Sequence, residues 1–143
     1  MPPAGVKSCD ALCDWSYTNG IGVYERPLCA ARALCVSEDG CEAVALDRRK
    51  LCTEAERRSA LAHELGHLRT GSLYGPNSSP DEIRRAEYRA ESWAARALIP
   101  RERLLEAISR GCTEVWQLAD RFTVTEKLVR FALDIYGICE RVR

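Results

Sequence analysis

The segment that most constrains the fold of this chain is a predicted helix that carries both of the chain's histidines. Residues typical of helix termini stand at both of its ends. Thr53 and Glu56 form a capping-box pattern at its start, and Gly71 is placed to end it. Inside the helix, "AHELGH" sets His63 and His67 four residues apart. Because residues four apart share one face of a helix, both imidazoles can point at a single ion.

Glu64 directly follows the first histidine and lies about 100° around the helix from it. From there its carboxylate can reach a metal-bound water, but it is poorly placed to be a third ligand on the same face. In the H-E-x-x-H pattern two imidazoles bind zinc and the glutamate acts as general base. The sequence therefore predicts a zinc-hydrolase helix, and the alternative is an amphipathic helix with two partly exposed histidines.

A catalytic zinc needs a third protein ligand and an open fourth position. The chain has no third histidine, so this ligand must be a carboxylate or a cysteine. The segment "RAEYRAESWAARALIP" offers Glu87 and Glu91, four residues apart on a predicted helix. One can bind zinc while the other holds an imidazole N–H. Taken alone, both glutamates are better explained as solvated charges among neighbouring arginines.

Two motifs, "LAHELGHLRTG" followed by "AEYRAESWAARALIP", resemble the ImmA/IrrE family of small metallopeptidases. The similarity covers roughly residues 17–136 and includes "GIGVYERPL", which resembles the family's early strand. The resemblance implies that His63, His67 and Glu87 bind the metal and that Glu64 is the general base.

The family usually has Asn or Asp where this chain has Glu91. In related zinc peptidases an acidic residue at this place orients a ligand histidine, which is the role that the resemblance implies for Glu91. Tyr74, in the loop between the two motif helices, is a candidate donor to the oxyanion of the reaction, and surface packing explains it equally well.

The resemblance also implies an activity and a partner. It implies a zinc-dependent endopeptidase of a phage or mobile element, with one zinc per chain, that cleaves or inactivates a helix-turn-helix repressor. The alternative is a non-hydrolytic, zinc-containing regulator that sequesters a repressor or a toxin-system partner. The two differ in whether Glu64 is needed.

The hydrophobic pattern predicts one α+β domain over residues 1–143, with a helical part at about 101–143. We expect a zincin-like fold with a glutamate third ligand, in which a small antiparallel sheet of about three strands packs on the H-E-x-x-H helix. Segment 41–47, "CEAVALD", is the expected sheet edge for a substrate strand. The predicted helices are 5–18, 53–70, 79–98, 101–110, 114–121 and 126–136, and the predicted strands lie in 21–28 and 31–47, with a turn at 38–40. Thr113 and Thr125 are the expected caps of the last two helices.

The charge and composition of the chain indicate which kinds of partner and which compartment to expect. Lys+Arg and Asp+Glu both number 21, so the formal net charge is zero. A neutral chain gives no indication of nucleic acid or an anionic membrane as its main partner. No signal peptide or membrane-spanning run is visible, which predicts a cytoplasmic protein and favours reduced thiols over disulfides for the eight cysteines.

The C-terminal stretch "QLADRFTVTEKLVRFAL", residues 117–133, resembles a helix-turn-helix with Thr123 in place of the usual turn glycine. Its second helix offers only Lys127 and Arg130 as cations, which argues against direct DNA binding. A surface that docks a protein partner is the favoured interpretation.

Overall fold

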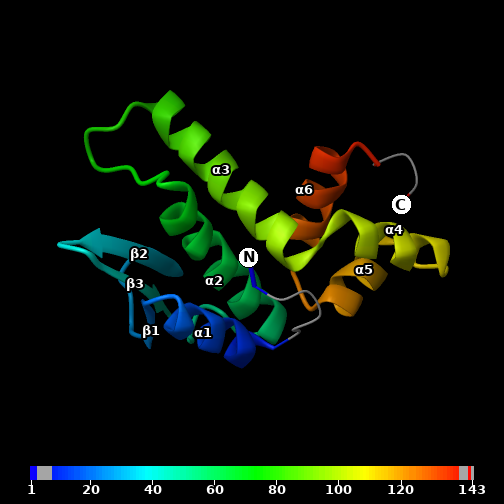
Figure 1. Ribbon diagram of the computed structural model, residues 1–143, viewed down its shortest axis with the longest axis horizontal. Helices are drawn as coiled ribbons and strands as arrows, with labels where there is room; N and C mark the ends of the chain where they lie inside the picture. The colour runs from blue at the N-terminus through cyan, green and yellow to red at the C-terminus, as the bar shows by residue number, and fades with distance from the viewer. Residues whose placement is uncertain (3–7, 139–141, 143) are drawn as a thin grey trace.

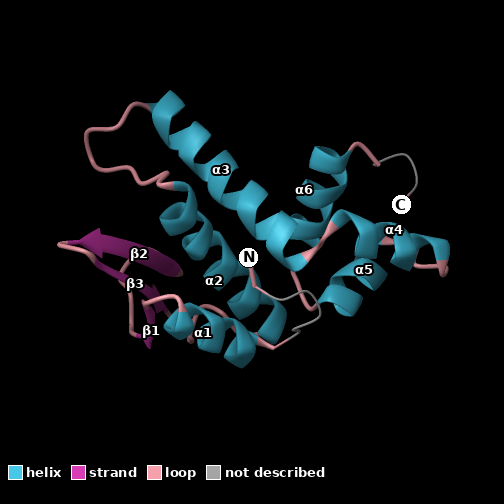
Figure 2. Cartoon of the chain, viewed as in Figure 1, coloured by secondary structure: helices cyan, strands magenta, loops and turns pink. Residues whose placement is uncertain are grey.

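The computed structural model describes residues 1–2, 8–138 and 142, and these form an α+β fold (Figures 1 and 2). A helix and three strands precede five helices, as the sequence predicts. Of the first predicted helix, residues 5–7 lie outside the described part of the chain. The elements are α1 (Cys9–Thr18), β1 (Ile21–Glu25), β2 (Ala33–Glu38), β3 (Cys41–Leu46), α2 (Glu54–Thr70), α3 (Pro80–Leu98), α4 (Arg101–Ser109), α5 (Val115–Phe122) and α6 (Glu126–Tyr136).

The sheet is mixed, and the prediction of an antiparallel sheet is wrong for one strand. Its strand order is β1-β3-β2. β2 and β3 form an antiparallel hairpin, in which Asp39 and Gly40 take left-handed φ angles of 51° and 77°. Such angles are those of the tight hairpin turns that match strand twist. β1 runs parallel to β3, from Ile21 beside Glu42 to Glu25 beside Leu46.

A buried carboxylate just after β3 accounts for the parallel strand. The Asp47 side chain is 1% exposed, and its Oδ2 accepts a hydrogen bond from the Leu28 N–H at 2.9 Å. The Arg26 N–H donates to the Leu46 carbonyl at 3.0 Å. Because these bonds tie the chain after β1 to the end of β3, both strands end at the same side of the sheet. Hydrogen bonds from the Arg49 side chain and the Leu28 N–H hold the pKa of Asp47 well below its usual range.

β3 is thus the central strand, so the prediction that 41–47 forms the open edge is wrong. Within the described residues the free edge beside α2 belongs to β2, which packs against that helix. An extended peptide can add to β2 but finds no unpaired backbone on β3.

The two helices that carry the motifs are capped as the sequence predicts. The Thr53 hydroxyl accepts from the Glu56 N–H at 3.1 Å, and Gly71 ends α2 with a left-handed φ of 64°. Ser79 and Glu82 form a reciprocal capping box at the start of α3. The two helices lie side by side (Figure 1).

Gly66 sets the distance between α2 and α3. A Cβ atom at this position would lie 2.9 Å from the Ala90 Cα and still closer to the Ala90 carbonyl oxygen. These are backbone atoms of α3, which cannot rotate away as a side chain can. The glycine is therefore required for the close crossing of the two helices.

The C-terminal pair α5–α6 packs its turn onto α2. Thr123 has a φ of 52°, the left-handed conformation expected of the turn residue in this pair. The buried Arg58 guanidinium donates to the carbonyls of Phe122 and Thr123. The Ser59 hydroxyl accepts from the Thr125 N–H at 3.0 Å. Two consecutive residues of α2 thus hold this turn in place.

One predicted cap of this pair is correct and one is wrong. Thr125 caps α6 by accepting from the Leu128 N–H at 3.3 Å. The cap of α5 is Glu114 rather than Thr113, and the Glu114 N–H donates to the Gln117 side chain at 3.1 Å.

Buried side chains form one cluster that runs from the sheet and α1 through α2 to α6. The single domain over residues 1–143 stays a prediction. No helix in the described part of the chain is both long enough and apolar enough to cross a membrane. The seven cysteines that the structure describes are free thiols.

Gly66→Ala should lower the free energy of unfolding by up to about 2 kcal/mol. Overpacking typically costs about 1–3 kcal/mol, which exceeds the gain of about 1 kcal/mol in helix propensity. Denaturant unfolding measures the change. Gly75→Ala is the control, since no atom lies within 4 Å of the added methyl group, and it should be neutral or slightly stabilising. An increase in stability for Gly66→Ala would contradict the close crossing.

Candidate metal centre

Three side chains from the two motif helices converge on one point. His63 and His67 come from α2, and Glu87 comes from α3. The two Nε2 atoms of the histidines lie 3.2 Å apart. Glu87 Oε1 is 3.1 Å from His67 Nε2, and Glu87 Oε2 is 3.0 Å from His63 Nε2. The three predicted ligands therefore lie together. Among the described residues, they form a group that could hold a metal ion.

The outer nitrogens of the two rings determine which atoms carry protons. His67 Nδ1 lies 2.9 Å from the Ser72 carbonyl, which can only accept, so this nitrogen must be the donor. His63 Nδ1 lies 2.5 Å from the Glu91 carboxylate and donates in the same way. In neutral imidazoles both Nε2 atoms then present lone pairs to each other and to Glu87. Three acceptors this close repel one another unless a cation lies between them.

The spacing of these acceptors fits a small tetrahedral ion. For metal–ligand bonds of about 2.0–2.1 Å, the ligand atoms of a tetrahedral site lie about 3.3 Å apart. The three distances of 3.0–3.2 Å are close to that value. Three protein ligands also leave the fourth position open, as a catalytic site requires. The cluster can therefore hold a metal ion.

Nearby charges favour a cation at this point. Burial lowers the pKa of His63, but the hydrogen bond and charge of Glu91, together with Glu87 and Glu64, raise it above its ordinary value overall. Burial raises the pKa of Glu87, but the Tyr74 hydroxyl and the two histidines lower it overall. Glu87 thus stays ionised at neutral pH, and the same carboxylates that stabilise a protonated His63 attract a metal cation.

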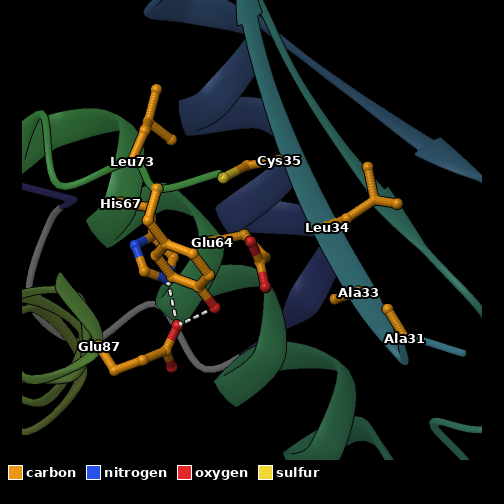
Figure 3. A pocket seen from close by; sticks show the side chains of 9 residues that line it. Ala31, Ala33, Leu34, Cys35, Glu64, His67, Leu73 and Glu87 are labelled. Atoms are coloured by element: carbon orange, nitrogen blue, oxygen red, sulfur yellow. Dashed lines mark hydrogen bonds and ion pairs between the residues drawn. The ribbon is translucent and has the colours of Figure 1, made fainter. Parts of the chain in front are cut away.

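Glu64 lies beside the cluster and is not part of it. Its side chain faces the cavity between α2 and β2, where Figure 3 shows it near Cys35 and Glu87. Burial and the charge and hydrogen bonding of Glu64 raise the pKa of the Cys35 thiol to about 12. The thiol therefore stays protonated at neutral pH. Glu64 and Glu87 line the same two cavities, so the Glu64 side chain faces the space beside the cluster.

Tyr74 reaches the cluster from the loop after α2. Its hydroxyl donates to Glu87 Oε1 at 2.8 Å, and its ring packs edge-on against His67 with centroids 5.8 Å apart. The hydrogen bond to Glu87 raises the pKa of Tyr74 to about 12, so the hydroxyl remains a donor at neutral pH. The expectation of mere surface packing does not describe these contacts.

Two cavities flank the cluster and share Ala33, Glu64 and Glu87. The smaller, of about 280 Å³, is lined mainly by apolar groups of β2 and of the loop after α2 (Figure 3). The larger, of about 580 Å³, is lined by apolar, polar and charged groups and reaches β2 at Ala33. The two cavities meet at the three residues that they share.

Sequence reasoning missed two contributors to the site. Ser72 acts through its backbone carbonyl, so no side-chain pattern could reveal it. Cys35 was given no role beyond that of a reduced thiol. The alternation of β2, with Ala33 and Cys35 facing the same side, was the signal that could have placed it on the inner face.

Comparisons with known proteins agree with this geometry. The family model of the IrrE N-terminal-like domain, a peptidase family, matches residues 33–134. That match contains both motifs and all three converging residues, and it leaves out the early strand included in the resemblance. A search of curated proteins finds no match. Because the family model covers more than half of the chain, the protein belongs to the IrrE N-terminal-like family of peptidases, the ImmA/IrrE type that its two motifs resemble.

Proposed function

We propose that this protein is a zinc-dependent endopeptidase that cleaves a helix-turn-helix repressor of a phage or mobile element. The observation that carries the proposal is the convergence of three potential ligand atoms, from His63, His67 and Glu87, with Glu64 beside them. Two imidazoles, one carboxylate and an open position are the ligands of catalytic zinc in several peptidases. One zinc per chain follows from this set.

Zinc bound there supplies Lewis acidity for the attack of water on a peptide carbonyl. Glu64 accepts the proton of the attacking water and returns it to the leaving amine. Its position outside the ligand cluster suits that task, because a general base must keep its lone pairs free. Tyr74, protonated and directed at the site, is the proposed donor to the oxyanion.

Glu91 orients a metal ligand instead of binding the metal. Its carboxylate lies 2.5 Å from His63 Nδ1, on the side of the ring away from the ligand cluster. This contact fixes the tautomer in which Nε2 is free to bind. The extra methylene relative to Asn or Asp is accommodated by this geometry.

The substrate backbone adds to the free edge of β2. That strand lines the smaller cavity with Ala33 and Cys35, directly opposite Glu64. Strand addition would draw an extended peptide past the cluster and present a carbonyl to it. A repressor with an extended, accessible segment is the expected form of substrate.

The choice of a repressor rests on the resemblance of the two motifs to ImmA/IrrE proteins, and the cytoplasm is the compartment where such a substrate is met. A regulator that binds the repressor without hydrolysis would use the same metal site. It would not need Glu64 as a base.

The purified protein should bind about one zinc per chain, and the double variant His63→Ala/His67→Ala should bind none at this site. Elemental analysis of folded protein measures the ratio, with circular dichroism to confirm folding. If the double variant keeps its full zinc content, the cysteines hold the metal and the assignment fails.

Zinc titrations should separate the two glutamates. Glu87→Ala removes a ligand and should abolish nearly all zinc binding. Glu91→Ala removes only the partner of His63 and should weaken zinc affinity by about 10–100-fold. A larger loss for Glu91→Ala than for Glu87→Ala would reverse the assignment.

Glu64→Gln should keep zinc, fold and repressor binding while losing cleavage, because the amide cannot accept the proton. Each variant is co-expressed with the candidate repressor, with fragments read by gel and derepression by a reporter. Glu106→Gln, an exposed position on α4, is the matched control and should cleave as wild type does. Derepression by Glu64→Gln at the wild-type level, with the repressor intact in both, would leave the binding regulator as the explanation.

A further inference from the structure

The larger cavity beside the metal cluster has one wall that comes from the C-terminal helices. α6 contributes Thr125 and Lys127, across from Arg32, which lies just before β2. The floor is formed by the part of α2 that carries Glu56 and Ser59. A peptide that follows β2 through the smaller cavity and past the cluster would next enter this larger cavity.

α6 is fixed relative to the metal site by α2 itself. Arg58 and Ser59 bind the turn that precedes α6, and His63 follows them by only one helical turn. Lys127 is therefore held at a defined place in the larger cavity. α6 corresponds to the second helix of a helix-turn-helix, which a DNA-binding protein would place in the major groove. In this protein the N-terminal end of α6 lies against α2, the helix that carries the proposed general base.

Four carboxylates line this cavity; Glu56, Glu87 and Glu91 have partners, and Glu64 is the proposed general base. Glu56 accepts from the Cys52 N–H at 2.8 Å and lies 3.6 Å from Arg32. Glu91 binds His63, and Glu87 belongs to the ligand cluster. Lys127 is exposed and forms no ion pair with any residue that the structure describes. Within the described residues, Lys127 is therefore the cation of this cavity that has no carboxylate partner, whereas Arg32 lies beside Glu56.

We propose that Lys127 is a specificity-determining residue that selects substrates with an acidic side chain on the α6 side of the scissile bond. This inference rests on the proposed peptidase function and adds a substrate class to it. Attraction to Lys127 favours Asp or Glu there, and repulsion disfavours Lys or Arg. The C-terminal helical pair thus takes part in substrate recognition.

Peptide hydroxamates test the inference without requiring hydrolysis, because the hydroxamate chelates the bound zinc. Two series carry a tripeptide on the amino or on the carboxyl side of the chelating group, each with Glu, Gln or Lys at its far end. With zinc-loaded protein, one series should bind the Glu probe about 5-fold more tightly than the Lys probe, the scale of one exposed ion pair. Raising the salt concentration should reduce the preference.

Lys127→Glu should reverse that order, so that the Lys probe binds more tightly than the Glu probe. Arg130→Glu makes the same charge change one turn along α6, outside this cavity, and should leave the order unchanged. A preference that survives Lys127→Glu, or no preference in either series, would overturn the inference. Charge-selective binding without repressor cleavage would contradict only the peptidase proposal, and cleavage without charge preference would contradict only the role of Lys127.

Discussion

The contact between Gly66 and the backbone of Ala90 is the constraint on which the site depends. Glu87 precedes Ala90 by three residues and Glu91 follows it directly, so this crossing brings both carboxylates to the histidine face of α2. A side chain at residue 66 would separate the helices. The three ligand atoms could then no longer all bind one ion. Gly66 weakens its own helix, but it leaves the space that the backbone of the neighbouring helix occupies.

The second constraint is electrostatic. Lone pairs from two imidazoles and a carboxylate are held together by hydrogen bonds on their outer sides, at Ser72, Glu91 and Tyr74. Folding thus assembles a cluster that attracts a cation, either a proton or a metal ion. A metal ion bound there would add to the stability of the α2–α3 pair.

The sequence was most informative where the signal is local. Helix ends, the hairpin turn at Asp39 and Gly40, and the ligand spacing all follow from residues a few positions apart. Strand neighbours are different, because alternation identifies a strand without identifying its partner. The parallel pairing of β1 depends on the buried Asp47, which binds a backbone N–H 19 residues earlier. The place of Lys127 depends on Arg58 and Ser59, more than 60 residues before it, so no local pattern predicts it.

His67 is oriented by a main-chain carbonyl, and every amino acid offers one. The hydrogen bond that orients His67 therefore does not involve the side chain of residue 72. It depends mainly on the number of residues between His67 and that carbonyl. Among related chains, the start of the loop after α2 should therefore resist insertions and deletions. Sequence comparison scored on residue identity alone would underrate this segment, although the orientation of His67 depends on its length.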